Sequence, residues 1–137
     1  MTTRILLVAL GVAWVVAFAG LVWMMTLAQL RPHHALLLLI HLDFVLKACV
    51  ALSVVSAAIG IISLRAGARP RPLIGVGGAF GWGVLGALYG VAGAWTGLIS
   101  IPFAVYAPYY AEALIVLLVG LTGALLCLGL LSRRTPR

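Results

Sequence analysis

The sequence predicts an all-α membrane protein with four transmembrane helices, and three observations carry this prediction. The chain is 65% hydrophobic and 8% charged, with a mean hydropathy of +1.26, so a soluble fold would have too little polar surface to cover its core. Four apolar segments each reach the roughly 20 residues that cross a bilayer. These segments lack the alternation of polar and apolar residues that marks the strands of a membrane barrel.

The four helices are expected at about 5–30, 36–64, 73–95 and 108–131, in a single transmembrane domain that covers 1–137. The first segment carries no charge and is expected to pack or to face lipid. A signal peptide cleaved near its Ala17-Phe-Ala19 is the alternative. The apolar run continues beyond a typical signal core, which favours a retained helix.

The basic residues are distributed unequally between the two sides of this path. The formal net charge is +7, and seven arginines flank helix ends on one side: Arg4, Arg65, Arg69, Arg71, Arg133, Arg134 and Arg137. The other side has Arg31, His33 and His34. The positive-inside rule therefore predicts that both termini are cytoplasmic. We interpret these charges as topology determinants and contacts to membrane lipid, and we do not expect nucleic acid as a partner.

The second segment carries the run His41-Leu-Asp43-Phe-Val-Leu-Lys47 in its first half. Asp43 and Lys47 are four residues apart with the acid first, which favours an ion pair on one helix face. A single helix over 36–64 would be longer than the bilayer requires, so its first turns should project into the outer interface or the helix should tilt.

The third segment contains five glycines at alternating spacings of three and four: Gly83, Gly86, Gly90, Gly93 and Gly97. This spacing places them on one helix face. A stripe of small residues allows a neighbouring helix to approach closely. Packing inside one chain and packing between subunits are equally compatible with the pattern.

Glu112, the only glutamate in the chain, is expected near the start of the fourth helix, one turn after Pro108. In that position the helix dipole favours an anion. Glu112 is therefore either a pore or binding residue or a packed acid at a helix end. The preceding Tyr106, Tyr109 and Tyr110 are typical of an interfacial aromatic belt.

Counting along the helices at 1.5 Å per residue places Lys47 and Glu112 at nearly the same height, about 27 Å and about 30 Å above the arginine-flanked ends of their helices. Ionisable residues inside membranes usually pair or line a water-filled path. We therefore predict that Lys47 and Glu112 pair, within one chain or between subunits. Glu112, Lys47 and Asp43 form the predicted polar cluster or ion path.

No other pattern in the sequence indicates catalysis. The adjacent His33 and His34 make a weak metal site, and the glycines of the third segment follow no strand, unlike those of a dinucleotide-binding motif. We therefore expect no enzyme activity, no catalytic residue, no bound metal and no cofactor.

Three stretches resemble the ExbB/TolQ/MotA proton-channel family. His41-Leu-Asp43-Phe-Val-Leu-Lys47 and the residues up to Ser56 are similar to the first transmembrane segment of that family. Gly83-Val-Leu-Gly-Ala-Leu-Tyr-Gly90 is similar to the second, and Ala107-Pro-Tyr-Tyr-Ala-Glu112-Ala-Leu is similar to the third. The matches cover about half the chain in the family's order.

The resemblance implies a ring of subunits, typically a pentamer, around a single-span partner of the ExbD/TolR/MotB type in the bacterial inner membrane. It also implies that Glu112 lies near the ion path. This chain departs from the family in three ways. Ala87 and Leu117 stand where the family has pore threonines, the large cytoplasmic domain is absent, and an N-terminal helix is added.

These observations give two functional hypotheses of different classes and a weaker third. The first is an ExbB/TolQ-like, ring-forming subunit of an inner-membrane complex coupled to an ion gradient. The second is a non-conducting structural subunit of a larger membrane complex, which the departures favour. A small four-helix exporter ranks last, because its acid would be expected in the first helix, which has none.

Overall fold

The computed structural model describes residues 2–31, 33–67, 71–97 and 103–134, and this part of the chain is helical without a strand. The helices are α1 (Thr2–Leu27), α2 (His34–His41), α3 (Phe44–Arg65), α4 (Arg71–Gly97) and α5 (Phe103–Arg134). Four of them, all except the short α2, are long and apolar enough to cross a membrane. The prediction of an all-helical chain with four helices long and apolar enough to span a membrane is thus confirmed for the described residues, and these helices indicate a multi-pass membrane protein.

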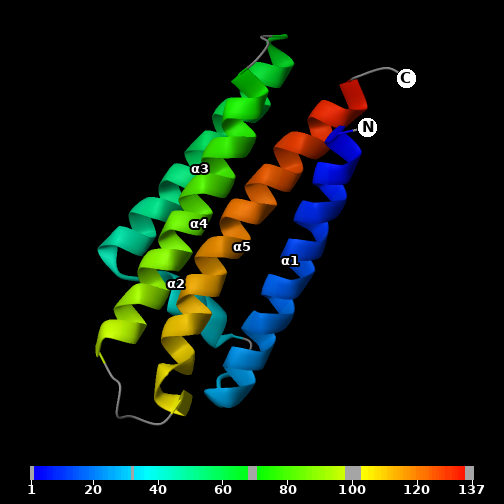
Figure 1. Cartoon of the computed structure of the whole chain (residues 1–137). Helices are drawn as coiled ribbons and strands as arrows, with labels where there is room; N and C mark the ends of the chain where they lie inside the picture. Colours follow the sequence, from blue (N-terminus) through cyan, green and yellow to red (C-terminus); the bar gives the residue numbers. More distant parts are fainter. Residues whose placement is uncertain (1, 32, 68–70, 98–102, 135–137) are drawn as a thin grey trace.

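The four long helices lie side by side in the order α3, α4, α5 and α1 (Figure 1). Helix α5 is central, since it contacts each of the other four helices. Helix α1 packs along α5 and is otherwise largely exposed. The start of α1, the end of α5, the end of α3 and the start of α4 all lie at one end of the molecule (Figure 1). We call this the arginine end, because Arg4, Arg65 and Arg133 lie there.

The predicted second helix, 36–64, is wrong as a single element, because the chain leaves the helical conformation between α2 and α3. Leu42 and Asp43 have φ/ψ of −49/144° and −57/152°, which are extended values. The Asp43 side chain accepts a hydrogen bond from the Phe44 N–H at 2.8 Å and so caps α3. Asp is among the best residues at a helix N-terminus, and this local preference competes with continuing the helix.

The expected start of the last helix near Pro108 is also wrong. Helix α5 begins at Phe103, and Pro108 lies inside it. Glu112 is consequently nine residues beyond the first residue of α5. The influence of a helix dipole is confined to the terminal turn, so the dipole does not explain the position of this acid.

Glycines bring α4 into close contact with the helices on both of its sides. A Cβ added to Gly83 would lie 2.8 Å from the Cα of Gly120 in α5, and one added to Gly75 would collide with the Cα of Gly60 in α3. Real Cβ atoms essentially never come this close to backbone. Only glycine therefore permits these two helix crossings.

The predicted glycine stripe packs within the chain over most of its length. Gly83 meets Gly120, Gly86 lies between Val116 and Cys49, and Gly90 faces Ala113. A Cβ at Gly93 would meet nothing within 4 Å. Gly97 is the last residue of α4, and its surroundings lie outside the described part of the chain. Of the two interpretations of the stripe, packing inside the chain applies to Gly83, Gly86 and Gly90.

Candidate functional site: an acidic pocket between α3, α4 and α5

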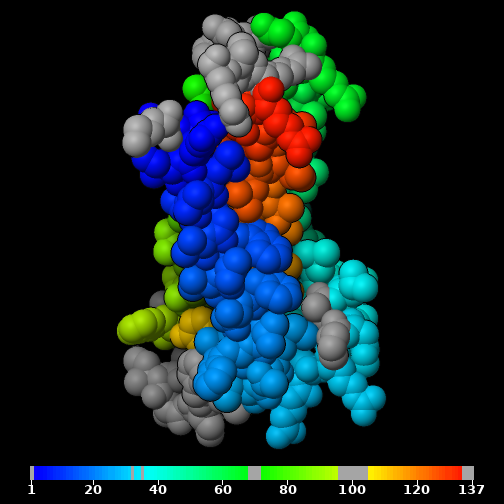
Figure 2. Space-filling model, turned by 90° about the vertical axis from the view of Figure 1, so that its right-hand side faces the viewer, coloured from blue at the N-terminus to red at the C-terminus, as the bar shows by residue number. Residues whose placement is uncertain are grey.

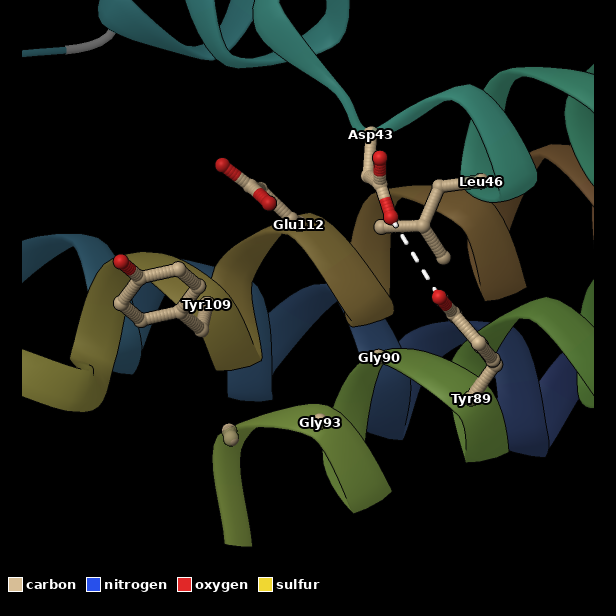
Figure 3. A pocket seen from close by; sticks show the side chains of 8 residues that line it. Asp43, Leu46, Tyr89, Gly90, Gly93, Tyr109 and Glu112 are labelled. Carbon is tan, nitrogen blue, oxygen red and sulfur yellow. Dashed lines mark hydrogen bonds between the residues drawn. The ribbon is translucent and has the colours of Figure 1, made fainter. Parts of the chain in front are cut away.

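A pocket of about 360 Å³ opens at the end of the molecule opposite the arginine end, where the start of α3 approaches α4 and α5. We call it the acidic pocket. It is lined by Asp43, Leu46, Tyr89, Gly90, Gly93, Ala94, Tyr109 and Glu112. Figure 3 shows Tyr109 and Glu112 projecting from α5, with Asp43 contributed by the start of α3 and Tyr89 by α4. Both acids of the sequence therefore line one pocket.

Three of the four polar side chains of the pocket are positioned by a local feature of their helices. Tyr109 and Glu112 are three residues apart on α5 and so share a face. Asp43 is held at the pocket by its cap on α3. Gly93 leaves space where any other residue would place a side chain, since a Cβ there meets nothing within 4 Å. The volume of the pocket thus depends on a glycine of the predicted stripe.

Both carboxylate oxygens of Asp43 are engaged. Oδ1 accepts from the Phe44 N–H at 2.8 Å, and Oδ2 accepts from the Tyr89 hydroxyl at 3.4 Å. The second bond is the dashed line in Figure 3 and is long for an O–H···O contact. Asp43 therefore joins the start of α3 to α4 across the pocket.

Glu112 is half-buried and, among the residues that the structure describes, makes no hydrogen bond or ion pair. The charged group that acts on it electrostatically is Asp43, a like charge. Two carboxylates that face one small pocket repel each other when both are ionised, and a proton or a bound cation relieves that repulsion. The arrangement is chemically suited to taking up and releasing a cation.

Lys47 does not line this pocket; its side chain is exposed on the first turn of α3. Within the described chain it pairs with neither acid, so the predicted Asp43–Lys47 pair and the intrachain form of the Lys47–Glu112 pair are wrong. For the Asp43–Lys47 pair, the reason is the break before α3. Asp43 precedes the helix, so the geometry of two residues four apart on one helix does not apply to its side chain. Pairing between subunits remains a prediction.

No family model, curated protein or solved structure matches this chain significantly.

Sequence reasoning placed Glu112 and Asp43 in the site but missed Tyr89 and Tyr109. Tyr109 was interpreted as part of an interfacial aromatic belt, although its spacing of three residues from Glu112 already put both on one face. Tyr89 precedes Gly90 of the glycine stripe. It enters the site only because α4 lies against the start of α3.

The described residues contain no group of three or more His, Cys, Asp or Glu side chains that could hold a metal ion. The His33 and His34 rings lie against each other, with centroids 4.2 Å apart, and the His34 Nδ1 accepts from the Arg31 backbone N–H at 3.0 Å. His34 therefore contributes to the turn before α2.

Proposed function

We propose that this chain is an ExbB/TolQ-like subunit of a complex in the bacterial inner membrane that is coupled to an ion gradient, with Glu112 as the carboxylate that exchanges the ion. One observation carries the proposal. The single glutamate of the sequence lies on a helix long enough to span the membrane, and it opens into a pocket with a second acid and two tyrosines. A carboxylate without a positive partner at this position is costly, and such residues usually mark ion or proton pathways.

Proton or cation exchange at Glu112 needs a route beyond the acidic pocket. Toward the arginine end, α4 and α5 meet at Gly83 and Gly120 without space between them. Ala87 and Leu117, at the positions where the family that the sequence resembles has threonines, line a separate apolar pocket of about 360 Å³. Since neither feature offers a polar relay, the proposed route continues at an interface between subunits or with a single-span partner of the ExbD/TolR type. The proposal therefore includes a homo-oligomeric ring, and it places both termini in the cytoplasm in keeping with the distribution of arginines.

The exposed Lys47 fits such an interface, because it pairs with neither acid of its own chain and is accessible to a neighbouring one. The proposed partner is Glu112 of a neighbouring subunit. The exchange Lys47→Glu with Glu112→Lys tests this pairing. Assembly lost in each single variant should return in the double variant, and failure to return would exclude direct pairing.

A non-conducting structural subunit is the second candidate, and the apolar surroundings of Ala87 and Leu117 favour it. In this case the acidic pocket would order the start of α3 against α4 through the bond between Asp43 and Tyr89, and no ion would pass. The glycine crossings of α4 are equally compatible with both candidates.

Proton flux in proteoliposomes separates the two candidates. The protein is reconstituted with any co-purifying single-span partner, and flux is measured for the wild type, Glu112→Gln and Glu112→Asp. Ion exchange predicts flux in the wild type, loss of at least tenfold in Glu112→Gln and partial recovery in Glu112→Asp, because the shorter side chain keeps the carboxylate. Flux that is absent, or that is equal in all three proteins, would favour the structural subunit.

A further inference from the structure

A second cavity, of about 510 Å³, lies between α1 and α3 and over the face of α5 that runs from Ile115 to Leu126. We call it the α1–α3 groove. Its lining is apolar apart from Thr122, whose hydroxyl already donates to the Leu118 carbonyl at 2.7 Å and accepts from the Trp14 indole N–H at 3.0 Å. The groove therefore offers an occupant only apolar contacts.

The groove has the length of one membrane leaflet. From Ile115 to Leu126 it extends about 16 Å along α5, and half of a hydrocarbon core about 30 Å thick is about 15 Å. Away from the arginine end it is bounded by α2, since Leu38 and Leu39 pack against the cluster that contains Leu21 and Ile115. Figure 2 shows α2, in cyan, beside the lower half of α1. Helix α2 thus limits the groove on that side, and the groove extends toward the arginine end.

Arginines continue both walls of the groove beyond its apolar part. On α3, the face that carries Ala58 and Ile61 reaches Arg65 one turn later. On α5, the face that carries Leu126 reaches Arg133 two turns later. Both arginine side chains are exposed and make no ion pair within the described chain.

The chain offers these arginines no side-chain carboxylate. Its two acids, Asp43 and Glu112, both line the acidic pocket at the opposite end of the molecule. The guanidinium groups of Arg65 and Arg133 are therefore available to an anion from outside the chain. A phosphate in the headgroup layer matches them, because arginine binds phosphate oxygens through parallel N–H···O bonds.

We propose that the α1–α3 groove binds one anionic phospholipid, with an acyl chain in the groove and its phosphate between Arg65 and Arg133. A volume of 510 Å³ over a length of about 16 Å gives a mean cross-section of about 30 Å². A helix with its side chains, at least about 10 Å wide, needs about 80 Å². The groove therefore has room for a lipid chain but not for a whole helix, which would have to lie across its opening.

Native mass spectrometry of the detergent-purified chain tests this assignment, with phosphatidylglycerol and phosphatidylcholine of identical acyl chains as probes. The wild type should retain one phosphatidylglycerol per chain and prefer it over phosphatidylcholine by about 30-fold, the value for two arginines near an anionic headgroup. The variant Arg65→Gln/Arg133→Gln should lose this preference. Arg31→Gln removes the same type of charge at the other end and should keep it.

A second pair of variants addresses the acyl chain without changing any charge. Ala58→Trp places a large side chain in the groove and should abolish retention of both lipids, whereas Ile59→Trp, on the same helix but outside the groove lining, should retain phosphatidylglycerol. Circular dichroism establishes that each variant is folded. Because the two sets of variants act on different parts of the lipid, either set decides the question if the other fails to fold.

Three results would overturn the proposal. The first is equal retention of both lipids by the wild type. The second is a loss in Arg31→Gln as large as that in the double arginine variant, which would indicate a general effect of charge. The third is a folded Ala58→Trp protein that keeps its phosphatidylglycerol.

Discussion

The contact between Gly120 and Gly83 allows a quantitative prediction for Gly120→Ala. An added Cβ would lie 2.6 Å from both the Ala79 carbonyl oxygen and the Gly83 Cα, whereas ordinary contact begins at 3.4 Å. The difference, about 0.8 Å, must be met by separating α4 from α5, because both obstructing atoms are backbone. When two packed surfaces separate by roughly 0.5–1 Å, each atom pair across the interface loses a quarter to a half of its dispersion energy. We expect Gly120→Ala to lower the free energy of unfolding by about 1–3 kcal/mol.

Reversible unfolding of the protein in mixed micelles, followed by circular dichroism as the fraction of denaturing detergent rises, measures this change. Gly129→Ala is the matched control, since it lies on the same helix and a Cβ there meets nothing within 4 Å. The control should differ little from the wild type. If Gly120→Ala were as stable as Gly129→Ala, the close approach of α4 and α5 would be incorrect.

The double variant Gly83→Ala/Gly120→Ala sharpens the same test. The first added methyl group already separates α4 from α5, so the second has less contact to disrupt. The sum of the losses of unfolding free energy in the two single variants should therefore exceed the loss in the double variant. Additive losses would indicate that the two glycines do not face each other.

Three further predictions follow from individual contacts. Asp43→Ala should destabilise the protein by about 0.5–2 kcal/mol through loss of the helix cap. Asp43→Asn should lose much less stability in the same unfolding assay, since the asparagine side-chain oxygen can also accept from the backbone N–H. Equal losses in the two variants would argue against capping. The hydrogen bond from Trp14 to Thr122 should contribute about 0.6 kcal/mol in a double-mutant cycle with Trp14→Phe and Thr122→Val, and a coupling energy near zero would exclude it. Reporter fusions at the two ends of the chain should both locate to the cytoplasm, and reporters on opposite sides of the membrane would contradict an even number of spans.

The residues of the acidic pocket were predicted from the sequence only in part. Glu112 and Asp43 were recognisable as functional candidates because an acid in an apolar segment is costly, and that cost follows from the residue type alone. Their place in one polar cluster was predicted, but with Lys47 as the residue that pairs with each of them. Counting residues from the arginine-flanked helix ends gave Lys47 as the partner of Glu112, because height along a helix does not say which face a side chain occupies. The two extended residues before Phe44 place Asp43 at the pocket, whereas Lys47 is exposed on α3.

The sequence alone determined the membrane class, the four spans and the positions where helices could approach closely. These properties depend on composition and on helical period, because the bilayer acts as a solvent that selects long apolar helices. Only the tertiary structure decided which glycines meet, where α3 and α5 begin, and that an apolar groove leads toward Arg65 and Arg133. Those features depend on which helix faces lie against each other, and the period of a single helix carries no information about its neighbour.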